Sequence, residues 1–559
     1  MKNEEFDVVV VGSGAGGSPP ALVMAQKGAR VLVLEKGRRH TRDDFLHDEI
    51  SMCRRDYFTP FPVDDPHTLR HGETETAQRT AAGWISQCVG GGTVHMSGFF
   101  LRFHPKDFAL SRHYGALRGS TAIDWPFEYE TLAPYYDRVE SELGVSGDTT
   151  DNPFAPPRRG PFPYPPILTH PVSAWIDDAG RKLGLHPFPM PRAIITTPNG
   201  SRGSCVYCAL CGSYGCEVDA KSSTLVSLLA AAEATKRCEV RAECMVTEIE
   251  VMRNGLARGV VYEDAQGQRH RVVARAVVVA ASALESARLL LLSRSSSHPN
   301  GLGNNSGQVG RNLCFSTLGQ LKGRFDYADF DAEGVEILKN PMPFVGRAIQ
   351  DAYEVAPSGD VFGKGGTFHF LWAHPNPIFA AEQLIHAREH ERERDPRRLI
   401  FGRPLIERMA KHFRDGRTLE VECFGEWLPT PGCYVSLDPK ITDRFGLPAA
   451  RITIDRHPSD RASSQVVVDR ARSMLEALRC RDIEVEAVGG ETLVLQHGTC
   501  RMGNDPTESV TTAAGHLHEV SNVYVTDGGS LPTSGAVPST LTILANAFRI
   551  ADHMAGAMG

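Results

Sequence analysis

A glycine-rich turn near the start of the chain has the residue types and spacing of a dinucleotide phosphate site. Residues 12–17 read GSGAGG. In this spacing Gly12 allows a tight turn, Gly14 lets the backbone approach a pyrophosphate, and Gly17 lets a helix pack on the preceding strand. Glu35 follows where a carboxylate accepts hydrogen bonds from ribose hydroxyls. The carboxylate favours a free 2′-hydroxyl over a 2′-phosphate, but it does not distinguish NAD from FAD.

The elements around this turn are those that a phosphate site requires. A β-branched run predicts a strand at residues 6–11, and the pattern predicts a helix at 18–27 and a second strand at 31–34. Together they make a βαβ unit in which the amides and the positive dipole of the helix N-terminus face the phosphates. We therefore expect an α/β protein with a Rossmann-type domain. The cofactor-binding residues predicted in this unit are Gly12, Ser13, Gly14, Ala15, Gly16, Gly17, Glu35 and Lys36.

The composition of the 559-residue chain excludes several other classes of protein. The formal net charge is −7, whereas a nucleic-acid groove needs clustered basic residues, so no nucleic-acid partner is expected. The most apolar interior run, residues 274–292, is interrupted by Arg275, Glu285 and Arg288, so no membrane span is expected either. The acidic N-terminus lacks the basic and apolar regions of a secretory signal. We therefore expect a cytoplasmic protein.

Four of the thirteen cysteines form a cluster with metal-like spacing: Cys205, Cys208, Cys211 and Cys216. The spacing resembles that of a ferredoxin, but it has an extra residue and lacks the following proline. Four thiolates could also hold zinc. We expect instead reduced cysteines that pack a tight loop before a helix at residues 222–233, with no metal ligands. An iron–sulfur cluster is the open alternative.

The last sixty residues carry three further motifs. Residues 495–506 read LQHGTCRMGNDP, residues 522–530 read NVYVTDGGS, and residues 538–547 read PSTLTILANA. This set resembles the segments that build the flavin site of the glucose–methanol–choline (GMC) oxidoreductases. Residues 89–95 (VGGGTVH) and 279–290 (VAASALESARLL) are similar to two more segments of that family. The resemblance implies that the dinucleotide is FAD.

The resemblance also implies the domain organisation and further cofactor contacts. The implied fold is a Rossmann-type FAD-binding domain, at residues 1–160, 200–315 and 485–559, with a substrate-binding domain at 316–484 and parts of 161–199. The substrate-binding domain is expected to contain an antiparallel sheet. The further cofactor-binding residues that it implies are Gly91, Gly92, Thr93, His95, Val246, Asp527, Gly528, Ser539, Thr540 and Leu541.

Several segments outside the motifs have patterns of their own. Period-two alternation predicts strands at residues 367–372 and 419–424. The residues around Asp438 and Asp443 match a hairpin of the family. The proline-rich residues 150–200 are predicted to be an extended connection, and the charged residues 386–398 a solvated helix or loop.

The implied reaction is oxidation of a CH–OH group to a carbonyl, with hydride transfer to the flavin. The hydroxyl proton then needs a base, and a neutral histidine suits because its ordinary pKa of ~6.5 lies near working pH. His497 is the candidate base, although the family histidine usually stands where this chain has Leu495. The second catalytic residue of the family, an Asn or His, falls at Pro538, and Ser539 and Asn546 are the candidates to replace it. A helix that begins at residues 538–540 would stabilise negative charge on the reduced flavin.

The resemblance leaves the substrate, the cofactor linkage and the electron acceptor less defined. Residues 205–223, Asp107 and Asp124 resemble those of bacterial sugar, polyol and glycoside dehydrogenases, so a carbohydrate-like alcohol is the expected substrate. Some sugar-oxidising members bind flavin covalently through a histidine at the position of His95. We expect no such bond here, with covalent attachment as the alternative. The acceptor is oxygen, a quinone or a redox protein. The altered helix start at Pro538 leaves a second function open, a non-redox lyase that keeps its FAD, like a hydroxynitrile lyase.

Overall fold

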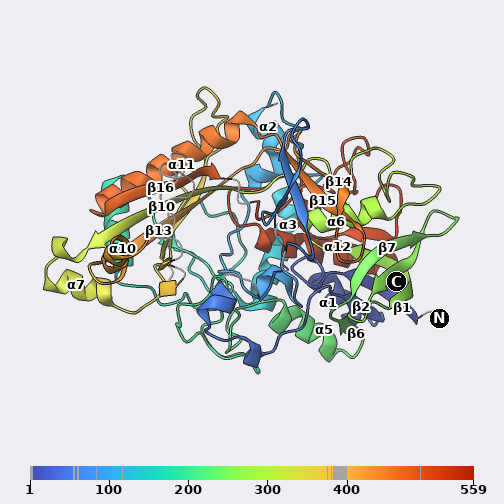
Figure 1. The fold of residues 1–559 in the computed structure, drawn as a ribbon, viewed down its shortest axis with the longest axis horizontal. Coiled ribbons are helices and arrows are strands. Elements are labelled where there is room, and N and C mark those ends of the chain that lie inside the picture. The colour runs from blue at the N-terminus through green and yellow to red at the C-terminus, as the bar shows by residue number, and fades with distance from the viewer. Residues whose placement is uncertain are drawn as a thin grey trace.

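The computed structural model describes residues 4–53, 57–59, 62–83, 85–115, 117–150, 152–373, 376–378, 380–381, 400–490 and 493–558. The charged segment at residues 386–398 lies outside the described residues. Within this part of the chain the strands form three sheets (Figure 1). The α-helices are α1 (Ser18–Gln26), α2 (Leu110–Tyr114), α3 (Tyr129–Val139), α4 (Val172–Lys182), α5 (Ala230–Ala234), α6 (Ala283–Leu292), α7 (Ala332–Lys339), α10 (Arg403–Phe413), α11 (Pro458–Ala477) and α12 (Thr540–Met558).

The largest sheet has the doubly wound arrangement that the sequence predicts. Its order is β6-β2-β1-β9-β8-β7, and β17 pairs with β9. β1 runs parallel to β2 and β9, whereas β8 is antiparallel to β7 and β9. The predicted strands at 6–11 and 31–34 and the helix at 18–27 are confirmed as β1, β2 and α1. The strands are β1 (Glu4–Val11), β2 (Val31–Leu34), β6 (Cys238–Arg241), β7 (Met245–Val251), β8 (Ala257–Glu263), β9 (Arg269–Val279) and β17 (Val523–Val525).

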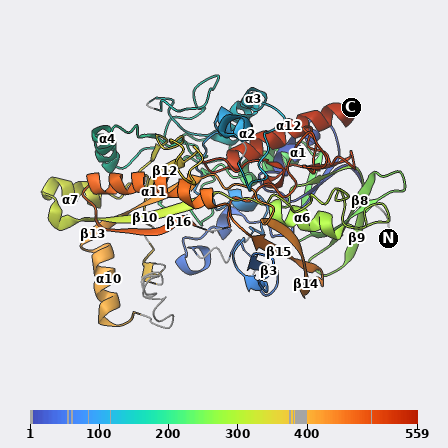
Figure 2. The same cartoon turned by 90° about the horizontal axis from the view of Figure 1, so that it is seen from above.

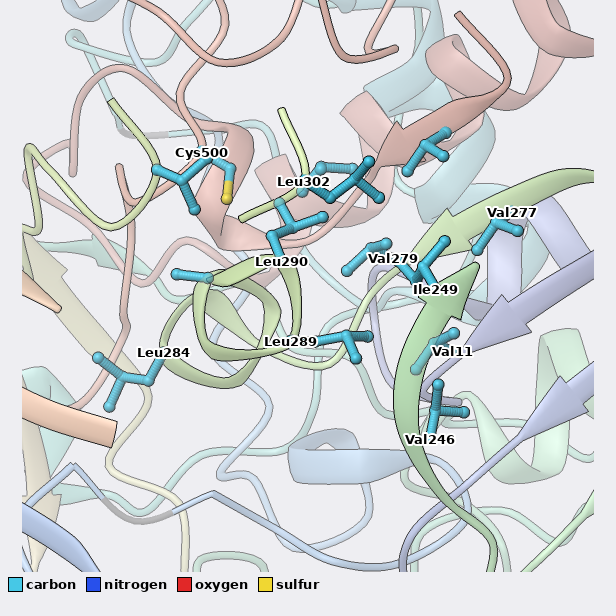
Figure 3. Packing of buried hydrophobic residues seen from close by; sticks show 14 of the residues in the cluster. Val11, Val246, Ile249, Val277, Val279, Leu284, Leu289, Leu290, Leu302 and Cys500 are labelled. Atoms are coloured by element: carbon cyan, nitrogen blue, oxygen red, sulfur yellow. The ribbon is translucent and has the colours of Figure 1, made fainter. Parts of the chain in front are cut away.

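Helices cover both faces of this sheet. α1 and α12 lie side by side on one face of the sheet (Figure 2). Val8 and Val10 are fully buried on that face. On the opposite face, Val11 and Val279 pack in one cluster with Leu290 of α6 (Figure 3). Because water reaches neither face, the central strand positions are all apolar, and the sequence reads as a continuous β-branched run.

The second sheet is antiparallel and lies at the other end of the molecule (Figure 1). Its order is β16-β10-β13-β12-β11-β5, and the predicted strands at 367–372 and 419–424 are confirmed as β12 and β13. One face is apolar and packs on α11, with Leu321 and Val421 against Val468. The strands are β5 (Phe188–Pro189), β10 (Thr317–Asp326), β11 (Arg347–Ile349), β12 (Gly366–Trp372), β13 (Gly416–Gly425) and β16 (Arg481–Gly490).

The third sheet contains the hairpin that the sequence indicates around Asp438 and Asp443. Its order is β14-β15-β3-β4, from β3 (His67–His71), β4 (Gln78–Thr80), β14 (Tyr434–Thr442) and β15 (Pro448–Ile454). Arg288 of α6 fixes the hairpin to the Rossmann side, because Nη2 donates to Oδ2 of Asp443 at 2.6 Å and Nε donates to the carbonyl of Pro448 at 2.7 Å. The predicted domain boundaries stay a prediction.

Two local predictions need correction. The proline-rich residues 150–200 are not extended throughout, because α4 occupies Val172–Lys182 and buries Val172, Ile176 and Ala179. The run of prolines is interrupted after Pro171, which leaves an amphipathic stretch free to fold as a helix. The helix predicted at 222–233 begins later, at Leu225, with a π turn that continues into α5. Among the described helices, none has both the length and the apolar character needed to cross a membrane.

Candidate functional site

A cavity of about 780 Å³ is lined by residues of both the Rossmann sheet and the antiparallel sheet. It brings together residues that are far apart in the sequence: the glycine turn, the loop after residue 90, the end of β17 and the start of α12. The predicted cofactor-binding residues that line it are Gly12, Ser13, Gly14, Ala15, Gly16, Glu35, Lys36, Gly91, Gly92, Thr93, His95, Val246, Asp527, Gly528, Ser539 and Thr540. Gly17, Leu541 and His497 do not line it.

The glycine turn has the close backbone approaches that its spacing predicts. Gly12 has a φ of +94°, and a Cβ atom there would lie 2.3 Å from the carbonyl oxygen of Ala280. A Cβ on Gly17 would lie 1.9 Å from the carbonyl oxygen of Gly12, so Gly17 supports the turn from behind. Gly14 faces Gly91 with no side chain between them. The turn therefore presents bare backbone to the cavity, as a pyrophosphate site requires.

Glu35 lies at the end of β2 with its carboxylate against the turn. It accepts hydrogen bonds from the backbone amide of Ser13 at 3.0 Å, the hydroxyl of Ser13 at 2.6 Å and the amide of Gly37 at 2.9 Å. Burial raises the pKa of Glu35, although these donors oppose the shift. Because a carboxylate has about four acceptor positions, ribose hydroxyls can still bind at the cavity. The residues present fit FAD.

Asp527 joins the C-terminal segment to the glycine turn. Its side chain accepts hydrogen bonds from the amide of Gly529 at 2.8 Å and from the hydroxyl of Ser286. A Cβ atom on Gly16 would lie 2.8 Å from Cα of Asp527, so the two segments are in contact. Burial raises the pKa of Asp527 to about 6.

His497 lies behind the cavity wall. It is fully buried, and its Nε2 atom is 2.7 Å from Oγ of Ser539, which does line the cavity. Its backbone pairs with that of Cys314, through hydrogen bonds of 2.8 and 3.2 Å. Burial lowers the pKa of His497 to about 3, so the imidazole is neutral at physiological pH. Leu495 and Pro538, which stand where the family has titratable or amide side chains, also line the cavity.

Of the two candidates to replace the second family residue, only Ser539 lines the cavity. Asn546 lies further along α12, where its carbonyl accepts from Arg549 at 2.9 and 3.0 Å and its amide donates to Ser530 at 3.3 Å. Asn546 is thus occupied within the protein. The groups that face the cavity at the start of α12 are Pro538, Ser539 and Thr540.

His95 faces the cavity from the loop after the glycine-rich segment at 90–92. Its Nε2 atom is hydrogen bonded to Oγ of Ser86. Its ring stacks on Phe58 with a centroid separation of 5.0 Å and an interplanar angle of 20°. These contacts hold the ring in one orientation.

Sequence reasoning missed the wall of the cavity formed by the antiparallel sheet. Leu318, Gln320, Glu422 and Phe424 line the cavity from β10 and β13, and Phe99 lines it from the facing loop. The alternation at residues 419–424 did contain a signal, because it placed Glu422 and Phe424 on one face. Which face lines the cavity could not be read without the fold.

The cysteine cluster lies beside the cavity but does not line it. The four thiols surround a small apolar cavity next to Phe344, and they are free. Lys221 fixes their loop to the cavity wall, because its Nζ donates to the carbonyls of Met96 at 3.1 Å and Cys211 at 2.7 Å. Burial raises the pKa of Cys205 to about 12. Over the described ranges, no group of three or more His, Cys, Asp or Glu side chains is arranged to hold a metal ion. Their role as packing thiols stays a prediction.

The fold and the cavity define a dinucleotide-binding protein of the Rossmann type, with an antiparallel sheet that forms part of the cavity wall. Family models described as "GMC oxidoreductase" match residues 166–317 and 429–547, and one described as "FAD binding domain" matches residues 7–42. The chain belongs to the GMC oxidoreductase family. It is an FAD-dependent oxidoreductase that acts on a CH–OH group.

Individual relatives span almost the whole chain. The 6'''-hydroxyparomomycin C oxidase of Streptomyces lividus is 32% identical and is matched over 98% of this chain and 92% of its own. The 2-methyl-1,2-propanediol dehydrogenase of Mycolicibacterium austroafricanum is 32% identical, over 99% and 95%. The crystal structure of pyridoxine 4-oxidase from Mesorbium loti has the same fold, with a TM-score of 0.61 at 18% identity and 98% coverage of both chains. These relatives are oxidases and a dehydrogenase, so they give the lyase alternative no support.

Proposed function

We propose that the protein oxidises a carbohydrate-like alcohol whose CH–OH group is held at the antiparallel-sheet wall of the cavity. The observation that carries this proposal is a single cavity with two unlike walls. One wall is bare glycine backbone with Glu35, and the other carries the polar and aromatic side chains of β10 and β13. When bound, FAD supplies the two-electron acceptor for the hydride.

The proposed proton acceptor is His497, reached through Ser539. The substrate hydroxyl would donate to Oγ of Ser539, while the Ser539 proton passes to Nε2 of His497 at 2.7 Å. The substrate thus loses a hydride from carbon and a proton from oxygen, which leaves the carbonyl. A neutral imidazole is available because burial lowers its pKa. The negative charge that hydride transfer leaves in the cavity then favours the protonated imidazole.

The start of α12 supports the same charge change. Thr540 is its first residue, and Pro538, Ser539 and Thr540 line the cavity. The first amides of a helix have no partner within the helix, and they carry the positive end of its dipole. We propose that this end of α12 stabilises negative charge that develops in the cavity.

The proposed cofactor contacts are the predicted residues that line the cavity, and the proposed linkage is non-covalent. Support for the linkage comes from His95, whose Nε2 is engaged by Ser86 and whose ring is stacked on Phe58. We also propose a cytoplasmic location. The twelve cysteines whose side chains the structure describes are all free thiols, four of them in one loop, which suits a reducing compartment.

Anaerobic titration of the purified protein tests the function. We expect the flavin absorbance to bleach on addition of a sugar, a polyol or a simple alcohol from a panel, and to return with oxygen, a quinone or a redox protein, which identifies the acceptor. Absorbance that every member of the panel leaves unchanged would contradict the proposal. Product formation without bleaching would identify a lyase.

A further inference from the structure

The cavity wall formed by the antiparallel sheet has a fixed pattern of side chains. In the register of β10 and β13, Gln320 lies opposite Glu422 and Leu318 lies opposite Phe424. In the register of β12 and β13, His369 lies opposite Glu422 on its other side. Because side chains alternate across a strand, these residues share the face turned away from α11. Glu422 is therefore built into the centre of a rigid sheet.

The charges on this face are mostly acidic. Lys322 shares the face, and its Nζ atom lies 3.3 Å from Oε1 of Glu420 and 2.9 Å from Oε1 of Glu486. Lys322 therefore forms ion pairs with those two carboxylates. Of the described residues of β10 and β13 that line the cavity, Glu422 alone is ionisable. Arg192 acts on Glu422 electrostatically, but its guanidinium is stacked on the Phe99 ring at 4.3 Å and does not line the cavity.

His369 lies beside Glu422 and does not line the cavity itself. Its side chain is 1% exposed, and its Nε2 atom lies 3.0 Å from Oε2 of Glu422. Neither ring nitrogen makes a hydrogen bond of good geometry with the described residues. The ring lies between Phe99, at 4.1 Å, and Phe424, at 5.4 Å between centroids.

Together these groups match an ammonium. Glu422 provides a negative charge at the cavity, and the amide oxygen of Gln320 provides a second acceptor beside it. A neutral hydroxyl would use only the acceptors. We infer that the substrate carries an amino group as well as the CH–OH group, as an amino sugar or amino alcohol does, and that Glu422 binds it. This inference rests on the proposed oxidation of an alcohol in the same cavity.

The test compares matched alcohols on the purified flavin-containing protein. The first set of compounds is glucose, glucosamine and N-acetylglucosamine. The second set is an aminated polyol and its hydroxyl counterpart. Each compound is titrated anaerobically, and the rate of flavin reduction and the concentration for half-saturation are measured. We expect the aminated member to be preferred by at least about tenfold in rate over half-saturation, the size of one screened charge contact. We also expect N-acetylation, which removes the charge, to abolish the preference, and added salt to weaken it.

Two variants test whether Glu422 causes the preference for the aminated alcohol. Glu422→Gln is expected to bring the ratio of aminated to neutral alcohol close to one. Glu486→Gln is the matched control, because Glu486 lies on the same face but binds Lys322 and does not line the cavity. It is expected to keep the wild-type ratio. The inference is overturned if the wild-type protein does not prefer the aminated alcohol. It is also overturned if the preference survives Glu422→Gln, or if this variant slows flavin reduction equally with the aminated and the neutral alcohol. Failure of every alcohol to reduce the flavin would instead overturn the proposed function on which it rests.

Discussion

Nε2 of His497 lies 2.7 Å from Oγ of Ser539, and only Ser539 lines the cavity. In the proposed reaction, the histidine of the C-terminal motif would therefore reach the substrate through a hydroxyl rather than directly. Leu495, which has a φ of +55°, and the backbone pairing of His497 with Cys314 together hold the imidazole behind the wall.

Removing either partner of this pair should slow flavin reduction. We expect His497→Ala and Ser539→Ala each to lower its rate by about 100-fold or more, the scale of general base catalysis, while FAD stays bound. Ser539→Thr keeps the hydroxyl and should recover most of the rate. Stopped-flow reduction under anaerobic conditions measures all three. His186→Ala, at an exposed histidine paired with Asp351, is the control. A wild-type rate in His497→Ala would eliminate it as the base.

The same histidine should make the fold sensitive to acid. Its pKa is about 3 in the folded protein, below the ordinary value of 6.5, so the unfolded chain binds its proton more readily. His497 therefore does not lower the free energy of unfolding above pH 6.5, but it lowers this free energy progressively as the pH falls from 6.5 towards 3. Between pH 7 and 5 the loss is about 2 kcal/mol from this group alone. Thermal midpoints at the two pH values should differ less in His497→Gln than in the wild type. Equal differences in both proteins would contradict this account.

The glycine turn allows a matched pair of substitutions. Gly12→Ala places Cβ 2.3 Å from the carbonyl oxygen of Ala280, and we expect a protein without bound FAD. Gly28 has a similar φ of +89°, but a Cβ atom there would meet no atom of the described residues within 4 Å. Gly28→Ala should therefore cost only the backbone strain of about 1 kcal/mol and keep its flavin. The ratio of visible to ultraviolet absorbance after purification reports both. Yellow Gly12→Ala protein would show that the turn tolerates a side chain.

The sequence predicted the cofactor end of the cavity better than the substrate end, for a physical reason. The glycine turn and Glu35 belong to one local βαβ unit, and each glycine reflects a backbone requirement that can be read from neighbouring residues. Gln320 and Glu422 become neighbours only through the register of β10 and β13, which no local pattern encodes. His497 was identified from its motif. Its position behind Ser539 depends on a turn at Leu495, and a leucine in the sequence does not indicate a turn.

The linkage to the cofactor gives a prediction that is tested first on the wild-type protein. Since Nε2 of His95 bonds to Ser86 and the ring is stacked on Phe58, we expect FAD to be released on denaturation. After acid precipitation the yellow colour should be entirely in the supernatant. Colour that stays with the pellet in the wild type and leaves it in His95→Ala would show a covalent bond through that residue.

A buried cation holds two segments of the core together, and its loss should be costly. Lys364 is fully buried, with Nζ 2.7 Å from Oδ1 of Asp107 and a second bond to Glu426. Lys364→Met would leave two buried carboxylates without their cation, a change that costs about 3–5 kcal/mol. Lys106→Met removes an exposed lysine paired with Glu354 and should cost less than about 1 kcal/mol. Urea unfolding followed by flavin fluorescence compares them. If Lys364→Met is no less stable than Lys106→Met, Lys364 does not stabilise the fold through its contacts with Asp107 and Glu426.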